Sequence, residues 1–202
     1  MAISIYELKP AFIRLLRPVA ERLVSSNVTA NHITIPACLL SFCLGLALFF
    51  CPSSAFLWCL LPVWLFLRMA LNAIDGIMAR EYGQKTRLGA LLNEMCDVLA
   101  DAALIVPFAA VQGFSVAAVA AFAWGALLTE FTGVLAVCVG SPRRYDGPMG
   151  KSDRAFAMGV AGLFVASSCL WGWGVMQWLI SGFWLCSGLM LLTAYNRLRS
   201  AL

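Results

Sequence analysis

The chain has 202 residues, of which 62% are hydrophobic and only 12% are charged, with a formal net charge of +4. A soluble domain carries about 25% charged residues, so this composition excludes an ordinary soluble domain. Apolar runs long enough to cross a bilayer recur along the sequence and predict an all-α membrane protein. We expect membrane lipids as partners and no nucleic acid.

The first predicted element is an amphipathic segment over residues 3–25, in which apolar side chains alternate with Lys and Arg at roughly helical spacing. We expect residues 1–30 to form a juxtamembrane helix in the headgroup layer, with its cations on anionic lipid. Pro10 and Pro18 are expected to kink this helix or split it. A helix of a soluble bundle is the alternative, and the membrane span that follows argues against it.

Six membrane-spanning helices follow and form one membrane domain over residues 31–202. They are expected near residues 33–51, 55–83, 88–111, 115–139, 154–173 and 177–195. Basic residues gather in alternate connections and at both ends of the chain, whereas the opposite connections carry no charge. The positive-inside rule therefore places both termini and both basic loops in the cytoplasm.

Polar residues in the second and third predicted helices form the candidate site. Asn72 and Asp75 share one helical face, and Asn93 and Asp97 share another. The short turn between the helices makes them antiparallel, so we expect Asp75 level with Asp97, and Asn72 level with Asp101. Carboxylates at membrane depth are costly and usually mark a metal, a charged ligand or a proton path. The sequence predicts a pocket that opens to the cytoplasm.

Carboxylate and amide oxygens suit a hard divalent cation, Mg²⁺ or Mn²⁺, and such ions usually serve phosphate chemistry. Gly76, Ala79 and Gly89 leave room for a bulky phosphorylated ligand near the backbone, and Arg80 can clamp a phosphate. The eight cysteines form no Cys-x-x-Cys or Cys/His cluster, and His32 is the single histidine. Zinc, haem and iron–sulfur centres are therefore not expected.

These residues resemble the signature of the CDP-alcohol phosphatidyltransferase family, Asp-x-x-Asp-Gly-x-x-Ala-Arg, eight residues, Gly-x-x-x-Asp-x-x-x-Asp. Six of its eight fixed positions match with the spacing intact, namely Asp75, Gly76, Ala79, Arg80, Gly89 and Asp97. The segment from Ala30 to Thr34 is similar to the family's Pro-Asn-x-x-Thr segment. The start of the chain and the Gly-Lys-Ser-Asp-Arg run that ends at Arg154 resemble uncharacterised short enterobacterial-type members.

The resemblance implies a six-helix core after a juxtamembrane helix, a homodimer, and a site facing the cytoplasm of a bacterial inner membrane. It implies transfer of a phosphatidyl or related group from CDP-diacylglycerol or a related CDP-lipid to an alcohol acceptor, with release of CMP, in phospholipid biosynthesis. One or two Mg²⁺ or Mn²⁺ ions would be held at the four acid positions, which are here Asn72, Asp75, Asn93 and Asp97.

The resemblance also assigns roles to individual residues. Asp97 would be the base for the acceptor hydroxyl. The CDP moiety would bind at Asn31, Thr34, Gly76, Ala79, Arg80 and Gly89. Lys151 and Arg154 would hold a phosphate on the acceptor, as cations of this region do in members that use phosphosugars or glycerophosphate. The alternative for Lys151 and Arg154 is ordinary topogenic charge that touches lipid headgroups.

Asn72 and Asn93 depart from the family pattern, because an asparagine can coordinate through its carbonyl oxygen but brings no charge. We expect weaker metal binding as a result. Asp101 either compensates as a ligand or forms a buried ion pair with Arg68. Glu94 lies beside Asn93 but points about 100° away.

Two rival functions remain for the whole chain. The two lost charges favour a degenerate family member that binds CDP-lipid or a partner enzyme without turnover. A small transporter with an acidic site is the other rival, although the acids lie near one face of the membrane. Glu130, in the fourth predicted span, is either part of the site or a helix-packing acid.

Overall fold

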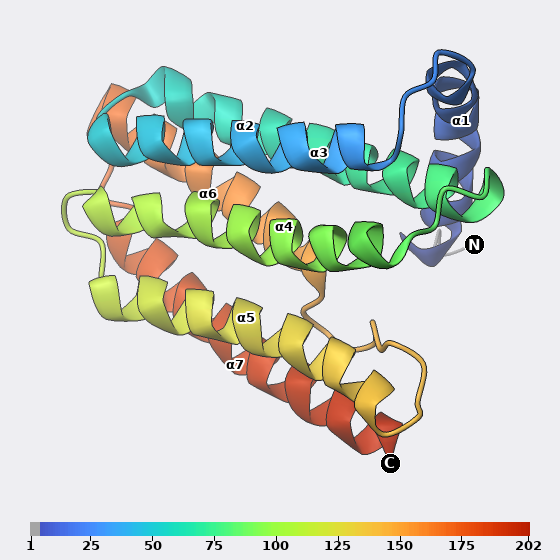
Figure 1. The fold of residues 1–202 in the computed structure, drawn as a ribbon. Helices are drawn as coiled ribbons and strands as arrows, with labels where there is room; N and C mark the ends of the chain where they lie inside the picture. Colours follow the sequence, from blue (N-terminus) through green and yellow to red (C-terminus); the bar gives the residue numbers. More distant parts are fainter. Residues whose placement is uncertain (1–4) are drawn as a thin grey trace. The chain divides into compact units, whose positions relative to one another are not determined.

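A computed structural model describes residues 5–202 of the chain and, from residue 12 onward, their side chains. The described residues form helices joined by turns and contain no β-strand, which confirms the all-α prediction. The elements are α1 (Ile5–Ser25), α2 (Asn31–Phe50), α3 (Ala55–Glu81), α4 (Arg87–Ile105), the 3₁₀ helix η1 (Val106–Ala110), α5 (Val116–Cys138), α6 (Lys151–Trp171) and α7 (Met176–Ala201) (Figure 1).

Five of these helices, α2, α3, α5, α6 and α7, are long and apolar enough to cross a membrane. Helix α4 differs because it carries Glu94, Asp97 and Asp101 within its span. The helix predicted over 88–111 ends at Ile105 and continues as η1, whose second residue is Pro107. The number of spans therefore stays a prediction, whereas the multi-pass character of the chain is clear.

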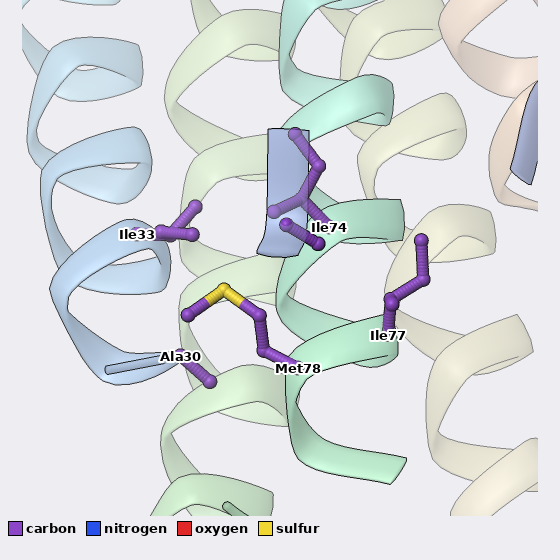
Figure 2. Close-up of a cluster of buried hydrophobic side chains, with 6 residues drawn as sticks. Ala30, Ile33, Ile74, Ile77 and Met78 are labelled. Atoms are coloured by element: carbon purple, nitrogen blue, oxygen red, sulfur yellow. The ribbon is translucent and has the colours of Figure 1, made fainter. Parts of the chain in front are cut away.

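Helix α1 forms one helix of 21 residues, so of the two expectations for Pro10 and Pro18, a kink or a split, the split is wrong. Its apolar side packs on a buried cluster with the first residues of α2 and the last turns of α3. That cluster consists of Ala20, Ala30, Ile33, Ile74, Ile77 and Met78, five of which are labelled in Figure 2. This packing holds the start of α2, near Asn31 and Thr34, against the end of α3, which carries the first half of the signature.

The chain divides into two compact units, and the first contains the described part of Met1–Leu40 together with Phe66–Asp97. Gln84 joins two connections of this unit. Its Oε1 accepts from the backbone N–H of Ala30 at 2.8 Å, and its Nε2 donates to the Val28 carbonyl at 3.2 Å. The α1–α2 linker is thereby held against the turn between α3 and α4.

The second unit contains Ser41–Leu65 and Val98–Leu202. Its helices α5 and α7 lie side by side (Figure 1). An aromatic cluster fills its interior, where the ring of Phe108 lies 4.7 Å from Trp58 and 5.1 Å from Phe183, measured between ring centroids. Small residues allow close helix contact, since a Cβ at Gly45 would overlap the carbonyl oxygen of Ala103.

Candidate functional site

The signature residues lie on the C-terminal half of α3 and the N-terminal half of α4, within the first unit. Helix α4 starts at a defined place because the Thr86 hydroxyl accepts from the backbone N–H of Gly89 at 2.9 Å. A threonine hydroxyl is a common cap for a helix N-terminus. The cap sets where Asn93 and Asp97, the next two signature positions, fall along α4.

Asp75 is buried, with 5% of its surface exposed, and contacts α2. The Thr34 hydroxyl lies 2.8 Å from Oδ2 of Asp75 and 3.1 Å from the carbonyl oxygen of Ala30. A hydroxyl has a single hydrogen to donate, and the shorter, charge-assisted contact to the carboxylate is the stronger one. Thr34, predicted as a CDP ligand, therefore holds Asp75 in this structure.

Asp97 on α4 contacts two residues of α3. Nδ2 of Asn72 donates to Oδ1 of Asp97 at 2.9 Å. Nη2 of Arg68 lies 3.7 Å from the same Oδ1 and donates to the Asp97 carbonyl at 3.2 Å. The two helices are thus connected by an amide and a guanidinium that share one carboxylate.

The register of this helix pair differs by about one turn from the prediction that Asn72 lies level with Asp101. Helix α3 ends at Glu81 and α4 begins at Arg87, so the turn is centred near Gln84. Asn72 lies twelve residues before Gln84, and Asp97 lies thirteen residues after it. Because Asn72 and Asp97 lie about equally far from the turn, they come level with each other on the two antiparallel helices.

The glycines of the signature leave space that polar side chains of the site enter. A Cβ at Gly76 would lie 3.2 Å from both terminal nitrogens of Arg80, so this guanidinium folds back over its own helix. A Cβ at Gly89 would lie 2.9 Å from the Thr86 hydroxyl and 3.1 Å from Oδ1 of Asn31. Arg80 therefore lies against Gly76 and Asn31 against Gly89, while Ala79 is half-buried beside Arg80 in sequence.

The donor set suits a hard cation only in part. Asp75 and Asp97 supply carboxylates, and Asn72 and Asn93 bring carbonyl oxygens, which are ligand types that Mg²⁺ and Mn²⁺ accept. Among the described residues, however, no group of three or more His, Cys, Asp or Glu side chains is arranged to hold a metal ion. With asparagine at two of the four signature positions, only Asp75 and Asp97 bring a carboxylate.

Asp101 and Arg154 meet in the second unit, a pairing that sequence reasoning missed. Nη2 of Arg154 lies 3.0 Å from Oδ2 of Asp101 and 2.7 Å from Oε1 of Glu130, and Nη1 donates to the Thr129 hydroxyl at 2.8 Å. The Arg154 side chain is fully buried. Asp101, predicted as a metal ligand or as a partner of Arg68, here neutralises Arg154.

Two further arginines join this buried cluster, which we call the arginine cluster (Arg143, Arg154 and Arg197 with Asp101 and Glu130). Arg143 donates to Oε2 of Glu130 at 2.9 Å, while Arg197 donates to the Thr129 carbonyl and, at 2.9 Å, to the Asp146 carbonyl. Lys151 starts α6 and is half-buried. In the sequence, Arg143 and Arg197 belong to the basic loop and the basic C-terminal segment that predict a cytoplasmic side, and no local pattern indicates that they lie near Glu130.

Residues 27–195 match the family model described as CDP-alcohol phosphatidyltransferase. The inner membrane protein YnbA of Escherichia coli (strain K12) is similar to this chain, with 46% identity over 199 residues, which are 98% of this chain and 96% of that protein.

Two crystal structures of phosphatidylinositol phosphate synthase from Mycobacterium tuberculosis share the fold at 23% sequence identity. The structure with CDP-DAG bound gives a TM-score of 0.73, covering 93% of this chain and 94% of that one. The complex with manganese and citrate gives a TM-score of 0.70, covering 92% and 88%. The fold that the chain shares with these synthases therefore agrees with the family model that its sequence matches.

Proposed function

Since the chain belongs to the CDP-alcohol phosphatidyltransferase family, we propose that it transfers a phosphatidyl group from CDP-diacylglycerol, or a related CDP-lipid, to an alcohol acceptor with release of CMP. One observation carries the proposal. The two halves of the signature, on α3 and α4, meet through the 2.9 Å hydrogen bond between Asn72 and Asp97. The CDP-DAG bound to a synthase of the same fold supports the choice of donor.

The cofactor of this proposal is Mg²⁺ or Mn²⁺, which would be held by the carboxylates of Asp75 and Asp97 with help from the carbonyl oxygen of Asn93. When bound, such an ion offsets the charge of the donor diphosphate and of the leaving CMP. Manganese in a synthase of the same fold supports this assignment. The oxygen chemistry of the four side chains fits the ion, although only two of them bring charge.

The side chains of the protein are proposed to bind the CDP-lipid, to orient the reacting groups and to accept a proton. Arg80, above Gly76, is proposed to contact the diphosphate, and Asn31 beside Gly89 the cytidine end, with Ala79 and Thr34 completing the CDP site. Asp97 accepts the proton of the acceptor hydroxyl as the acceptor oxygen bonds to the phosphatidyl phosphorus. The bond from that phosphorus to CMP breaks, and CMP leaves with the electron pair. Positioning and electrostatics supply most of the acceleration.

The site is proposed to face the cytoplasm of a bacterial inner membrane, with six spans and both termini inside. Basic residues in the turn after α3 and in the loop after α5 support this orientation. The likeness to an inner membrane protein supports the location. Helix α4 would be the remaining span, in addition to the five helices that are long and apolar enough to cross a membrane. A homodimer is part of the proposal and rests on the family resemblance alone.

Lys151 and Arg154 are proposed to lie near the acceptor. In the arginine cluster, Nε of Arg154 is buried with no hydrogen-bond partner among the described residues. This unused cationic donor favours an acceptor that carries an anionic group. Arg154 itself would act through the cluster, because its side chain is fully enclosed.

Release of CMP from CDP-diacylglycerol by the purified protein tests the proposal, with Mg²⁺ or Mn²⁺ and pooled alcohol acceptors that include phosphorylated ones. We expect metal-dependent release that Asp97→Ala abolishes and that Glu21→Gln, a change of an exposed acid on α1, preserves. Full turnover by a folded Asp97→Ala protein would refute the role of Asp97.

The two asparagines favour a second candidate, a degenerate member that binds the CDP-lipid without turnover. Binding of CDP-diacylglycerol without CMP release, under every metal and acceptor condition, would establish that candidate instead. Restoring both acids, in an Asn72→Asp and Asn93→Asp double variant, would then test whether the missing charges are the cause.

A further inference from the structure

Asn72 makes its contact with Asp97 through nitrogen. A carbonyl oxygen 2.9 Å from a carboxylate oxygen would repel it, so the amide N–H must face Asp97. The contact lies between two helices, and both residues are at least half-buried. Asn72 therefore orients Asp97 through an N–H donor.

Arg68 already supplies positive charge to the same carboxylate. Its guanidinium is 3.7 Å from Oδ1, with 5% of the Arg68 side chain and 12% of the Asp97 side chain exposed. Two carboxylates at the spacing of Asn72 and Asp97 would repel each other unless a proton or a cation lay between them. In this chain a direct hydrogen bond makes the connection, and a cation at that place is not needed.

Resting on the proposed function, we propose that Asn72 is a positioning residue for Asp97 and not a metal ligand, and that the site holds a single divalent ion. That ion, Mg²⁺ or Mn²⁺, would be held by the carboxylates of Asp75 and Asp97. The charges of the protein without its donor agree with one ion. Asp75, Asp97 and Arg68 together carry about one negative charge, so one divalent ion would bring the site to about +1 and a second to about +3.

The count of bound Mn²⁺ ions on the purified full-length protein tests this inference without reference to turnover. Equilibrium titration followed by electron paramagnetic resonance is expected to give one Mn²⁺ per chain for the wild type. Asn72→Ala should keep that count and affinity, whereas Asp75→Asn should lose the ion. Asn196→Ala, on α7, is the matched asparagine control and should behave as wild type. Two ions on the wild type, or loss of the ion in Asn72→Ala, would overturn the inference.

Asn72→Asp creates the acidic pair that the wild type avoids. We expect this variant to depend on Mn²⁺ for its stability, with an unfolding temperature that rises on Mn²⁺ addition more than that of the wild type. The readout works even if the variant folds poorly without metal, because rescue by Mn²⁺ is the expected result. An Asn72→Asp protein that is as stable as wild type without metal would show that Asn72 and Asp97 do not interact as described.

Measuring CMP release together with Mn²⁺ binding distinguishes a failure of this inference from a failure of the proposed function. Asn72→Ala should lower kcat for CMP release about 10- to 100-fold, as loss of a supporting hydrogen bond at a metal site does, and leave the Mn²⁺ requirement unchanged. A parallel loss of Mn²⁺ affinity would overturn the positioning role. A wild type that binds one Mn²⁺ but releases no CMP would reject the proposed transfer, whereas two bound ions with full CMP release would reject only the inference about Asn72.

Discussion

The hydroxyl of Thr34 on α2 holds Oδ2 of Asp75 on α3 at 2.8 Å, and both residues are buried. Thr34 stands in the segment that resembles the family's Pro-Asn-x-x-Thr run. Its contact connects that run to the signature acid directly. A residue predicted to bind the nucleotide thus supports the carboxylate that is proposed to bind the ion.

Thr34→Val removes the hydroxyl and keeps the side-chain shape. We expect Mn²⁺ affinity and CMP release to fall about 10- to 100-fold, because an unsupported carboxylate loses its orientation. Thr34→Ser keeps the hydroxyl and should retain most of both. Titration of CMP release with Mn²⁺ measures the effect. Equal activity in the valine and serine variants would show that the hydrogen bond does not support the ion.

Gly89→Ala places a methyl group 2.9 Å from the Thr86 hydroxyl and 3.1 Å from Oδ1 of Asn31. Disturbing the α4 cap costs about 1 kcal/mol, and we expect KM for the CDP-lipid to rise about fivefold with it. Gly182→Ala on α7 is the matched control, since a Cβ there meets no described heavy atom within 4 Å. The two KM values, measured side by side, decide whether the space at Gly89 matters. Identical values would argue against a ligand close to it.

Arg154→Ala removes the cation that the buried acids Asp101 and Glu130 share, and of the two only Glu130 keeps a second arginine of the cluster, Arg143. Removing one partner of a buried ion pair costs about 3–5 kcal/mol, so we expect a large loss of stability. The free energy of unfolding, measured by titration of the detergent-solubilised protein with sodium dodecyl sulfate, should fall by that amount. Arg199→Ala, at an exposed arginine of α7, should change it little. A wild-type value for Arg154→Ala would mean that Asp101 and Glu130 are not buried as charges.

Much of the fold was predictable because helix length and hydropathy are local properties of the sequence. The predicted ends of the second span, 55–83, lie within two residues of α3 (Ala55–Glu81). The continuity of α1 through Pro10 and Pro18 was not predictable in the same way. Packing of its apolar face on the ends of α2 and α3 stabilises a helix that local propensity alone disfavours.

The partners of individual charges were harder to predict than the helices. Spacing places Asn72 and Asp97 on particular faces, but the register of the hairpin depends on where the turn is centred, and an error of one turn changes the partner. For Arg154 no local pattern exists, because its acids lie 53 and 24 residues away along the chain. From the sequence alone, a basic residue close to a helix start cannot be distinguished from topogenic charge, because its partners lie on other helices.

The arginine cluster has a consequence for how the chain is made. Asp101, Glu130 and Arg154 stand on three successive helices, α4, α5 and α6, so the two acids are synthesised before the cation that they share. Until α6 is made, Glu130 of the apolar helix α5 has only Arg143 of the cluster as a cationic partner. The buried ion pairs of the arginine cluster are therefore completed late in synthesis, by the last third of the chain.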